Sequence, residues 1–196
     1  MPLNASARCL AVLREEHVWI ARMLECLERL IEDAARRGRL DAESSAELLA
    51  LFVHFADGVH QQREEYALFP RLLARASTVA ERMAIGKLCG DHEEERRSLR
   101  ALNERMLGAI YGRGSDLAGF LREAGLFVRL HRHHLVVENL NLLPLAERVL
   151  EAEDDALLCE LYQQLEHGEP GTAHVGSRIR VIGARLGLEP STASEQ

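Results

Sequence analysis

Apolar residues recur at helical spacing along most of the chain. Between about residues 5 and 37 they follow the three- and four-residue steps of an amphipathic helix, and Gly38 ends this pattern. A second helical pattern begins at Asp41, which is a suitable N-cap, and continues to about Phe69, where Pro70 marks a kink or a new first turn. The first third of the chain therefore predicts two long helices with a short break between them.

The rest of the chain continues in the same way. Ser77 or Thr78 caps a third helix that runs to about Tyr111, and the sequence YGRGSD forms the next break. A fourth helix begins near residues 115–116 and crosses the sequence LNLLP, and a shorter helix covers about residues 154–166. We expect a loop over HGEPGTAHVGS, a terminal helical segment over SRIRVIGARLG and a frayed end over LEPSTASEQ. No stretch alternates like a β-strand, so the pattern predicts an all-α protein.

The composition agrees with a helical globular protein. Hydrophobic residues make up 47% of the 196 residues and charged residues 28%, and the chain has only 5 prolines. The formal net charge is -7, and the arginine-rich stretches also contain acidic residues, which argues against a nucleic-acid partner. No run approaches the roughly 20 apolar residues of a membrane helix, so we expect a cytoplasmic protein with no membrane partner. The four scattered cysteines are typical of small buried hydrophobic residues.

Four histidines fall at one level if the long helices form an up-down-up-down antiparallel four-helix bundle. Two residues in an antiparallel hairpin lie opposite each other when they are equally far from the turn, because each residue advances a helix by about 1.5 Å. The midpoints between His17, His60, His92 and His134, taken in chain order, are 38.5, 76 and 113, and each midpoint falls in a predicted break. We expect this bundle to occupy residues 1–150.

We expect the remaining residues, 151–196, to form a C-terminal helix and a flexible tail packed on or beside the bundle. This division makes one domain with a short extension, which suits a chain of this length.

Two of the histidines are followed four residues later by a glutamate. The pairs His60–Glu64 and His134–Glu138 each place an imidazole and a carboxylate on one face of a helix, and a proline follows each pair. The four histidines lie on core-facing stripes, where polar side chains need a partner. Four imidazoles and two carboxylates suit two divalent metal ions, and the ligand types fit iron, zinc, copper or nickel. The second half of the chain repeats the first at an offset of 74 or 75 residues, which predicts two hairpins related by a pseudo-twofold axis.

Several sequences together resemble one known family. VHQQREEYALFP, DHEEERRSL, HHLVVENLNLLPLAE and the early EEHVWI resemble the hemerythrin-like HHE cation-binding domain over roughly residues 10 to 150. The resemblance implies a four-helix bundle that binds two iron ions with oxo or hydroxo bridging, and zinc or manganese is the less favoured metal. Matched residue by residue, it implies these metal ligands: His17, His60, Glu64, His92, His134 and Glu138.

One position departs from the oxygen-carrying hemerythrins, which have a second histidine one turn after the first on the third helix. Arg96 occupies this position, and a guanidinium does not bind a metal. We expect Arg96 to pair with a ligand carboxylate or to close the site, and a bolder hypothesis is that it holds an anionic or peroxidic species at the iron. Simple reversible oxygen storage is therefore a poorer fit.

Two further side chains near the proposed ligands are candidates for a role at the site, and the other histidines are not. His131 lies one turn before His134 and is an additional ligand, a residue behind the ligands or an exposed histidine. Glu95 lies three residues after His92 and can reach a metal, although its EEE run is typical of a solvated surface. We do not expect the remaining histidines to bind metal: His54, His133, His167 and His174.

The function we expect follows from two adjacent irons in a bundle core that restricts water. Such a pair suits binding or reaction with a small diatomic or peroxidic ligand, namely O2, NO or peroxide, at an open coordination position. The alternative is a non-catalytic iron- or oxygen-sensing or storage module whose stability depends on bound metal. The sequence leaves both turnover and simple binding open.

Overall fold

A computed structural model describes residues 7–112, 114–166 and 172–189, and every regular element within these ranges is a helix. The all-α prediction is therefore confirmed. The elements of the first half are α1 (Arg8–Arg37), α2 (Ala42–Leu51), the π-helical segments η1 (Phe52–Gln61) and η2 (Glu64–Leu68), α3 (Phe69–Arg75) and α4 (Val79–Tyr111). Those of the second half are α5 (Gly114–Val137), the π-helical segment η3 (Glu138–Leu142), α6 (Leu143–Val149), α7 (Ala152–Leu165) and α8 (Thr172–Arg185).

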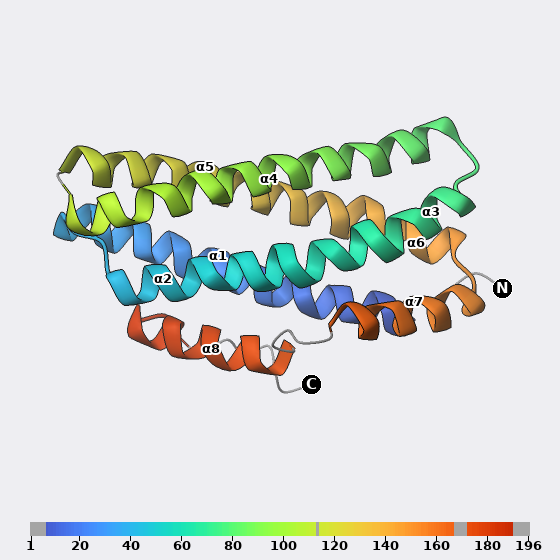
Figure 1. Cartoon of the computed structure of the whole chain (residues 1–196). Helices are drawn as coiled ribbons and strands as arrows, with labels where there is room; N and C mark the ends of the chain where they lie inside the picture. The colour runs from blue at the N-terminus through green and yellow to red at the C-terminus, as the bar shows by residue number, and fades with distance from the viewer. Residues whose placement is uncertain (1–6, 113, 167–171, 190–196) are drawn as a thin grey trace.

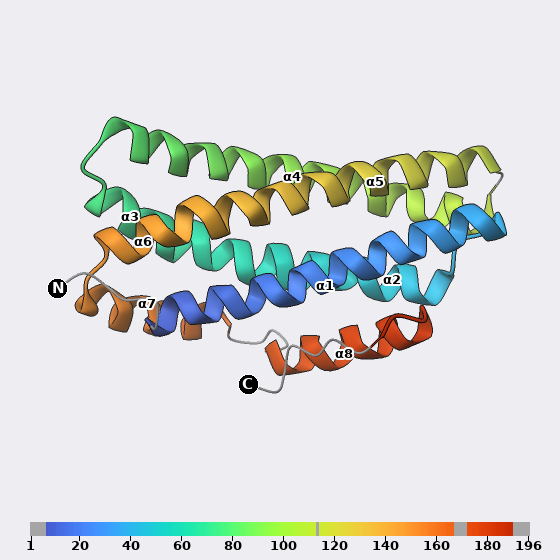
Figure 2. The same cartoon turned by 180° about the vertical axis from the view of Figure 1, so that it is seen from behind.

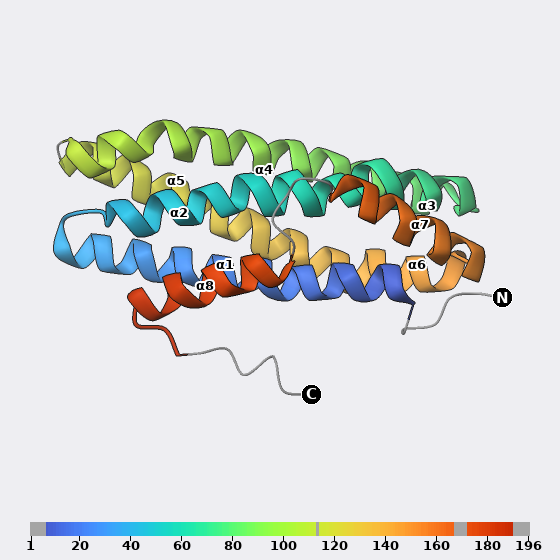
Figure 3. The same ribbon diagram turned by 60° about the horizontal axis from the view of Figure 1, so that its bottom comes forward.

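Long helical segments lie side by side and form a helical bundle (Figures 1 and 2). They are α1, the run from α2 to α3, α4, and the run from α5 to α6. Helix α5 packs against both α1 and α4, and α2 also packs against α1 and α4. The shorter helices α7 and α8 lie along one side of the bundle, toward opposite ends (Figure 3). Among the described residues, every helix is too short or too polar to cross a membrane.

The ends of the long helices follow local signals in the sequence. Gly38 ends α1 with a φ of 65°, a left-handed conformation that glycine adopts without steric strain. Asp41 caps α2, because its carboxylate accepts a hydrogen bond of 2.8 Å from the Ser44 N–H. Thr78 and Glu81 form a capping box at the start of α4. The first two predicted breaks are therefore confirmed at these residues.

The two segments that carry the HxxxE pairs are not uniform α-helices, which differs from the prediction. The Phe69 N–H bonds to the Glu64 carbonyl oxygen, and Leu143 makes the equivalent bond to Glu138, so each segment contains a wider π-helical turn. A proline follows each of these turns and lacks the N–H that would continue the α-helical pattern. The helix continues past the first proline to Arg75, beyond the end that we predicted near Phe69.

The C-terminal region corrects a second expectation. Helix α8 begins at Thr172, whereas we expected a loop over residues 167–177; residues 167–171 and 190–196 lie outside the described ranges. Apolar side chains at helical spacing explain the earlier start, since they are fully buried: Val175, Ile179 and Ile182. Helix α8 packs against α1 and α2, and α7 packs against α1 and η2. The division of the chain at residue 150 stays a prediction.

The core consists of two apolar clusters with a polar layer between them. One cluster includes Leu10, Leu72 and Ile85. The other includes Leu24 and Phe127, and each cluster contains further aliphatic and aromatic side chains. Along each long segment the chain passes from one cluster to the other, and the buried histidines and glutamates lie at the crossing. A buried polar layer at this level requires partners for its side chains.

Candidate metal centre

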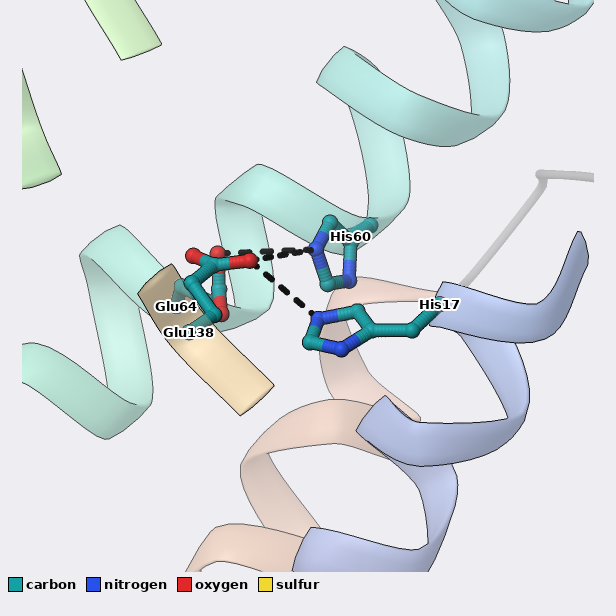
Figure 4. Close-up of side chains that lie close together, drawn as sticks. All are labelled: His17, His60, Glu64 and Glu138. Carbon is teal, nitrogen blue, oxygen red and sulfur yellow. Dashed lines mark ion pairs between the residues drawn. The ribbon is translucent and has the colours of Figure 1, made fainter. Parts of the chain in front are cut away.

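The polar layer brings together all six side chains that the family resemblance selected. They form two groups, and in each group four ligand atoms lie within 4.8 Å of one another. The first group is His17, His60, Glu64 and Glu138, and the second is Glu64, His92, His134 and Glu138. Figure 4 shows the first group, in which the two carboxylates turn toward the two imidazole rings. The four histidines that we placed at one level therefore lie at one level.

The two groups share both carboxylates. Glu138 directs one oxygen to each group, since its Oε2 lies 3.2 Å from His17 Nε2 and its Oε1 lies 2.8 Å from His134 Nε2. Glu64 Oε2 lies 3.6 Å from His60 Nε2 and 3.3 Å from His92 Nε2. Two metal ions could be held by such an arrangement, because each carboxylate belongs to both groups.

The donor atoms are buried, and most of them lack a hydrogen-bond partner within the described part of the chain. Such atoms include Nε2 of His17 and His60 and both carboxylate oxygens of Glu64 and Glu138. The Nε2 atoms of His92 and His134 face each other at 3.0 Å. An unsatisfied buried donor or acceptor costs about 1–3 kcal/mol, so several converging on one point favour a common cation. The residues present thus fit a metal pair.

Three of the imidazole rings are oriented from behind by side chains that the sequence analysis did not select. Each of these rings uses its Nδ1 for this contact, which turns its Nε2 toward the centre of the layer. The contacts are His17 with Asn139 Oδ1 (3.0 Å), His60 with Glu16 Oε2 (3.0 Å) and His92 with Glu65 Oε1 (2.7 Å). Every one of these partners is next in sequence to a proposed ligand, and this adjacency is the signal that could have found them.

The electrostatics of the layer favour charged pairs while no metal is bound. Burial lowers the pKa of His60 and of His134, but nearby carboxylates outweigh it and raise both values. These carboxylates are Glu64 and Glu138 for His60, and Glu138 and Glu95 for His134. The same opposition raises the pKa of His92 to about 12. Burial raises the pKa of Glu138, but the imidazoles around it, His134 foremost, hold it well below its ordinary value. A metal must therefore displace protons from these histidines.

His131 and Glu95 lie outside both groups, so the structure does not bring His131 to the cluster as the additional ligand that we considered. His131 Nε2 is 3.4 Å from Glu95 Oε2, and Gln61 donates a hydrogen bond of 2.7 Å to the same oxygen. The rings of Phe52 and Phe127 pack against His131, with centroids 5.8 and 4.5 Å away. Burial holds the pKa of His131 well below its ordinary value and raises that of Glu95 to about 7.

Arg96 approaches the layer from its side. Its Nη1 donates hydrogen bonds to Glu65 (2.9 Å), Gln61 (3.1 Å) and Asp57 (3.4 Å). Glu65 is the carboxylate that orients His92, so Arg96 pairs one step farther from the cluster than the ligand carboxylate that we expected. Its side chain remains 25% exposed.

The remaining histidines and the cysteines contribute nothing to the two groups within the described residues. His54, His133 and His174 are exposed, and His167 lies outside the described residues. All four cysteines are free, with Cys9 and Cys26 buried. The expectation of buried cysteines is confirmed for those two.

A helical bundle with adjoining sets of histidine and glutamate donors in one buried layer defines a class of metal-binding helical proteins. Within that class, the sequence profile of the hemerythrin HHE cation-binding domain matches residues 9–146, so the chain belongs to this family. The resemblance noted in the sequence is confirmed, and the matched region ends before α7 begins. No curated protein and no solved structure matches the chain.

Proposed function

We propose that the six side chains hold two iron ions, with Glu64 and Glu138 as the carboxylates between them. The observation that carries this proposal is the sharing of both carboxylates by two groups of four donor atoms. Imidazole and carboxylate ligands suit iron, and two negative charges between the ions reduce the repulsion between them. We also propose the up-down-up-down order of the long segments, which brings one histidine from each segment to this layer.

We infer that the metal pair binds or reacts with O2, NO or peroxide. Two adjacent irons, when bound, supply the electrons for two-electron chemistry on such a ligand. Four protein donor atoms in each group leave coordination positions for a small ligand. The chain excludes water from this layer, in part because Phe69 stacks on His92 with ring centroids 5.6 Å apart.

A non-catalytic iron- or oxygen-sensing or storage module is the alternative, and one observation favours it. The layer separates two apolar clusters, and several of its donor atoms, including Nε2 of His17 and His60, lack hydrogen bonds among the described residues. Metal bound only by the folded state stabilises that state by mass action. Loss of metal in the cell would then lower the stability of the folded protein, and this change would be the signal without any catalytic reaction.

The deciding experiment is metal analysis of the purified protein together with its visible absorption spectrum, before and after addition of peroxide and of NO. We expect about two irons per chain and absorption bands that respond to both ligands. Steady consumption of peroxide favours turnover, and a spectral response without consumption favours sensing. Zinc alone, or no metal in protein produced with added iron, would contradict the proposal.

Two substitutions test the sharing itself. His17 belongs to one group and Glu138 to both, so His17→Ala should keep about one iron per chain, whereas Glu138→Ala should lose most of both. Glu94→Ala is the matched control, because Glu94 is exposed and belongs to neither group. Iron per folded chain is measured after dialysis against buffer. Equal losses in the His17 and Glu138 variants would rule out two positions with shared carboxylates.

A further inference from the structure

Helix α7 is connected to a proposed ligand through a chain of charged contacts. Glu166, directly after α7, accepts a hydrogen bond of 2.8 Å from Arg63 Nη2. Arg63 Nη1 donates to Glu16 Oε1, and the other oxygen of Glu16 lies 3.0 Å from His60 Nδ1. The contacts thus run from α7 through Arg63 and Glu16 to the ring of His60.

The middle of this chain is buried. Arg63 is 2% exposed and Glu16 is fully buried, while the Glu166 side chain is 35% exposed. A buried guanidinium is stable only when it is paired, and its planar fork gives each pair a defined direction. The Tyr162 ring of α7 lies beneath the same guanidinium, with its centroid 5.5 Å from Arg63 Cζ. Helix α7 therefore supplies two of the contacts that set the position of Arg63.

The other end of α7 is also held firmly. The Asp155 carboxylate accepts a hydrogen bond of 2.8 Å from the Cys9 N–H at the start of α1. The buried Asp154 binds Arg71 and Arg75 of α3, the latter at 3.1 Å. Helix α7 packs along α1 and η2, the elements that carry Glu16 and the first shared carboxylate. These contacts make α7 a crosslink between the first and second long segments.

We propose that α7 positions His60 for metal binding through Arg63 and Glu16. The family match ends at residue 146, so this assigns a part of the metal centre to a segment outside the matched region. Glu166, Arg63 and Glu16 are positioning residues, because they act on the metal only through the His60 ring. This inference rests on the proposed iron site. Coupling is reciprocal, so metal binding must also stabilise the docking of α7 by the same factor.

The test compares Glu166→Gln with Glu160→Gln. Both glutamates belong to the α7 region, both changes remove one negative charge, and Glu160 is exposed. The proteins are loaded with ferrous iron without oxygen, and iron release to a chromogenic chelator is timed. Loss of a direct partner of a metal-bound histidine lowers metal affinity by about 10–100-fold, so this more distant change should speed release roughly threefold to tenfold. Glu160→Gln should release iron at the rate of the parent protein. Glu166→Asp keeps the negative charge and should release iron more slowly than Glu166→Gln.

A second readout separates positioning from general stabilisation. Cobalt(II) replaces iron, and its visible absorption reports the arrangement of its ligands. We expect the cobalt spectrum to change in Glu166→Gln and not in Glu160→Gln. Hydrogen exchange in α7 should slow when iron is added to the parent, and the effect should shrink in Glu166→Gln.

The outcomes are distinguishable. If the parent holds iron and Glu166→Gln matches it in release rate and in cobalt spectrum, the positioning proposal is overturned and the iron site stands. If the parent holds no iron, the proposed function fails and this inference fails with it. Faster release with an altered cobalt spectrum in Glu166→Gln alone supports the positioning role.

Discussion

At the scale of single residues, the candidate centre is built from pairs of neighbours in the sequence. In each pair one side chain belongs to the metal-binding groups, and the other orients an imidazole ring of a different segment. The pairs are Glu16 with His17, Glu64 with Glu65, and Glu138 with Asn139. Each long segment that contributes a pair therefore orients a histidine ring on another segment. The rings of His17, His60 and His92 are oriented by these contacts without a bound metal.

Arg96 provides the residue-scale prediction. We expect Arg96→Leu to keep the iron content of the parent and its rate of peroxide consumption, because Arg96 contacts Glu65 and not the metal-binding groups themselves. The contact between Glu65 and His92 does not involve Arg96, so we expect it to remain in this variant. Arg97→Leu is the control, since Arg97 is the exposed neighbour. A large loss of peroxide consumption at full iron content would contradict this expectation and favour a role in holding an anion.

At the scale of elements, π-helical turns place the carboxylates, and close contacts place the C-terminal helices. Both shared glutamates begin a π-helical segment, η2 or η3, where the helix is wider than an α-helix. Helix α8 lies close to α1 at Gly176, where a Cβ would be 2.7 Å from Trp19 Cζ2. The Arg180 guanidinium lies over the same indole ring, 5.5 Å from its centroid.

Gly176→Ala should therefore weaken the docking of α8. Forcing a methyl group into this contact should lower the free energy of unfolding by roughly 1–3 kcal/mol. Gly86→Ala is the control, because nothing lies within 4 Å of its Cβ position, and removing a helical glycine should stabilise by about 0.5–1 kcal/mol. Urea unfolding followed by circular dichroism measures both. The single tryptophan, Trp19, gives a fluorescence signal that should change at Gly176 and not at Gly86.

At the scale of the whole molecule, the polar layer between the two apolar clusters couples stability to metal and to protons. The pKa of three histidines is raised above the ordinary value of about 6.5 in the metal-free fold. Above that pH the unfolded chain releases protons that the metal-free fold still binds, so the metal-free protein loses stability as the pH rises. Metal-loaded histidines are neutral, so the loaded protein does not have this loss of stability above about pH 6.5.

The gap in melting temperature between iron-loaded and metal-free protein should therefore widen as the pH rises. As the pH falls below about 6.5, the loaded protein loses stability because protons bind the histidines of the unfolded chain. As the pH rises above about 6.5, the metal-free protein loses stability instead. Thermal melts of both forms between about pH 6 and 8.5 measure the gap. A gap that narrows with rising pH would show that the layer does not exchange protons for metal.

Much of the fold could be predicted because it follows from local signals. Gly38, Asp41 and Thr78 end or begin helices through contacts within a few residues. The level of the histidines followed from the constant rise of a helix, which turns distance along the chain into height in the bundle. The wrong start of α8 has a tertiary cause, because its apolar face is buried on α1 and α2 and outweighs the loop signal at Gly176.

The sequence by itself determined the long helices, the first two breaks between them and the level at which the histidines gather, since all three depend on spacing along one chain. Only the tertiary structure decided which oxygen of Glu138 faces which group, that His131 stays among the aromatic rings, and that α7 is linked to His60. These features depend on side chains that meet across different segments. These contacts depend on how the segments pack against one another, and the hydrophobic pattern of a single helix does not specify that packing.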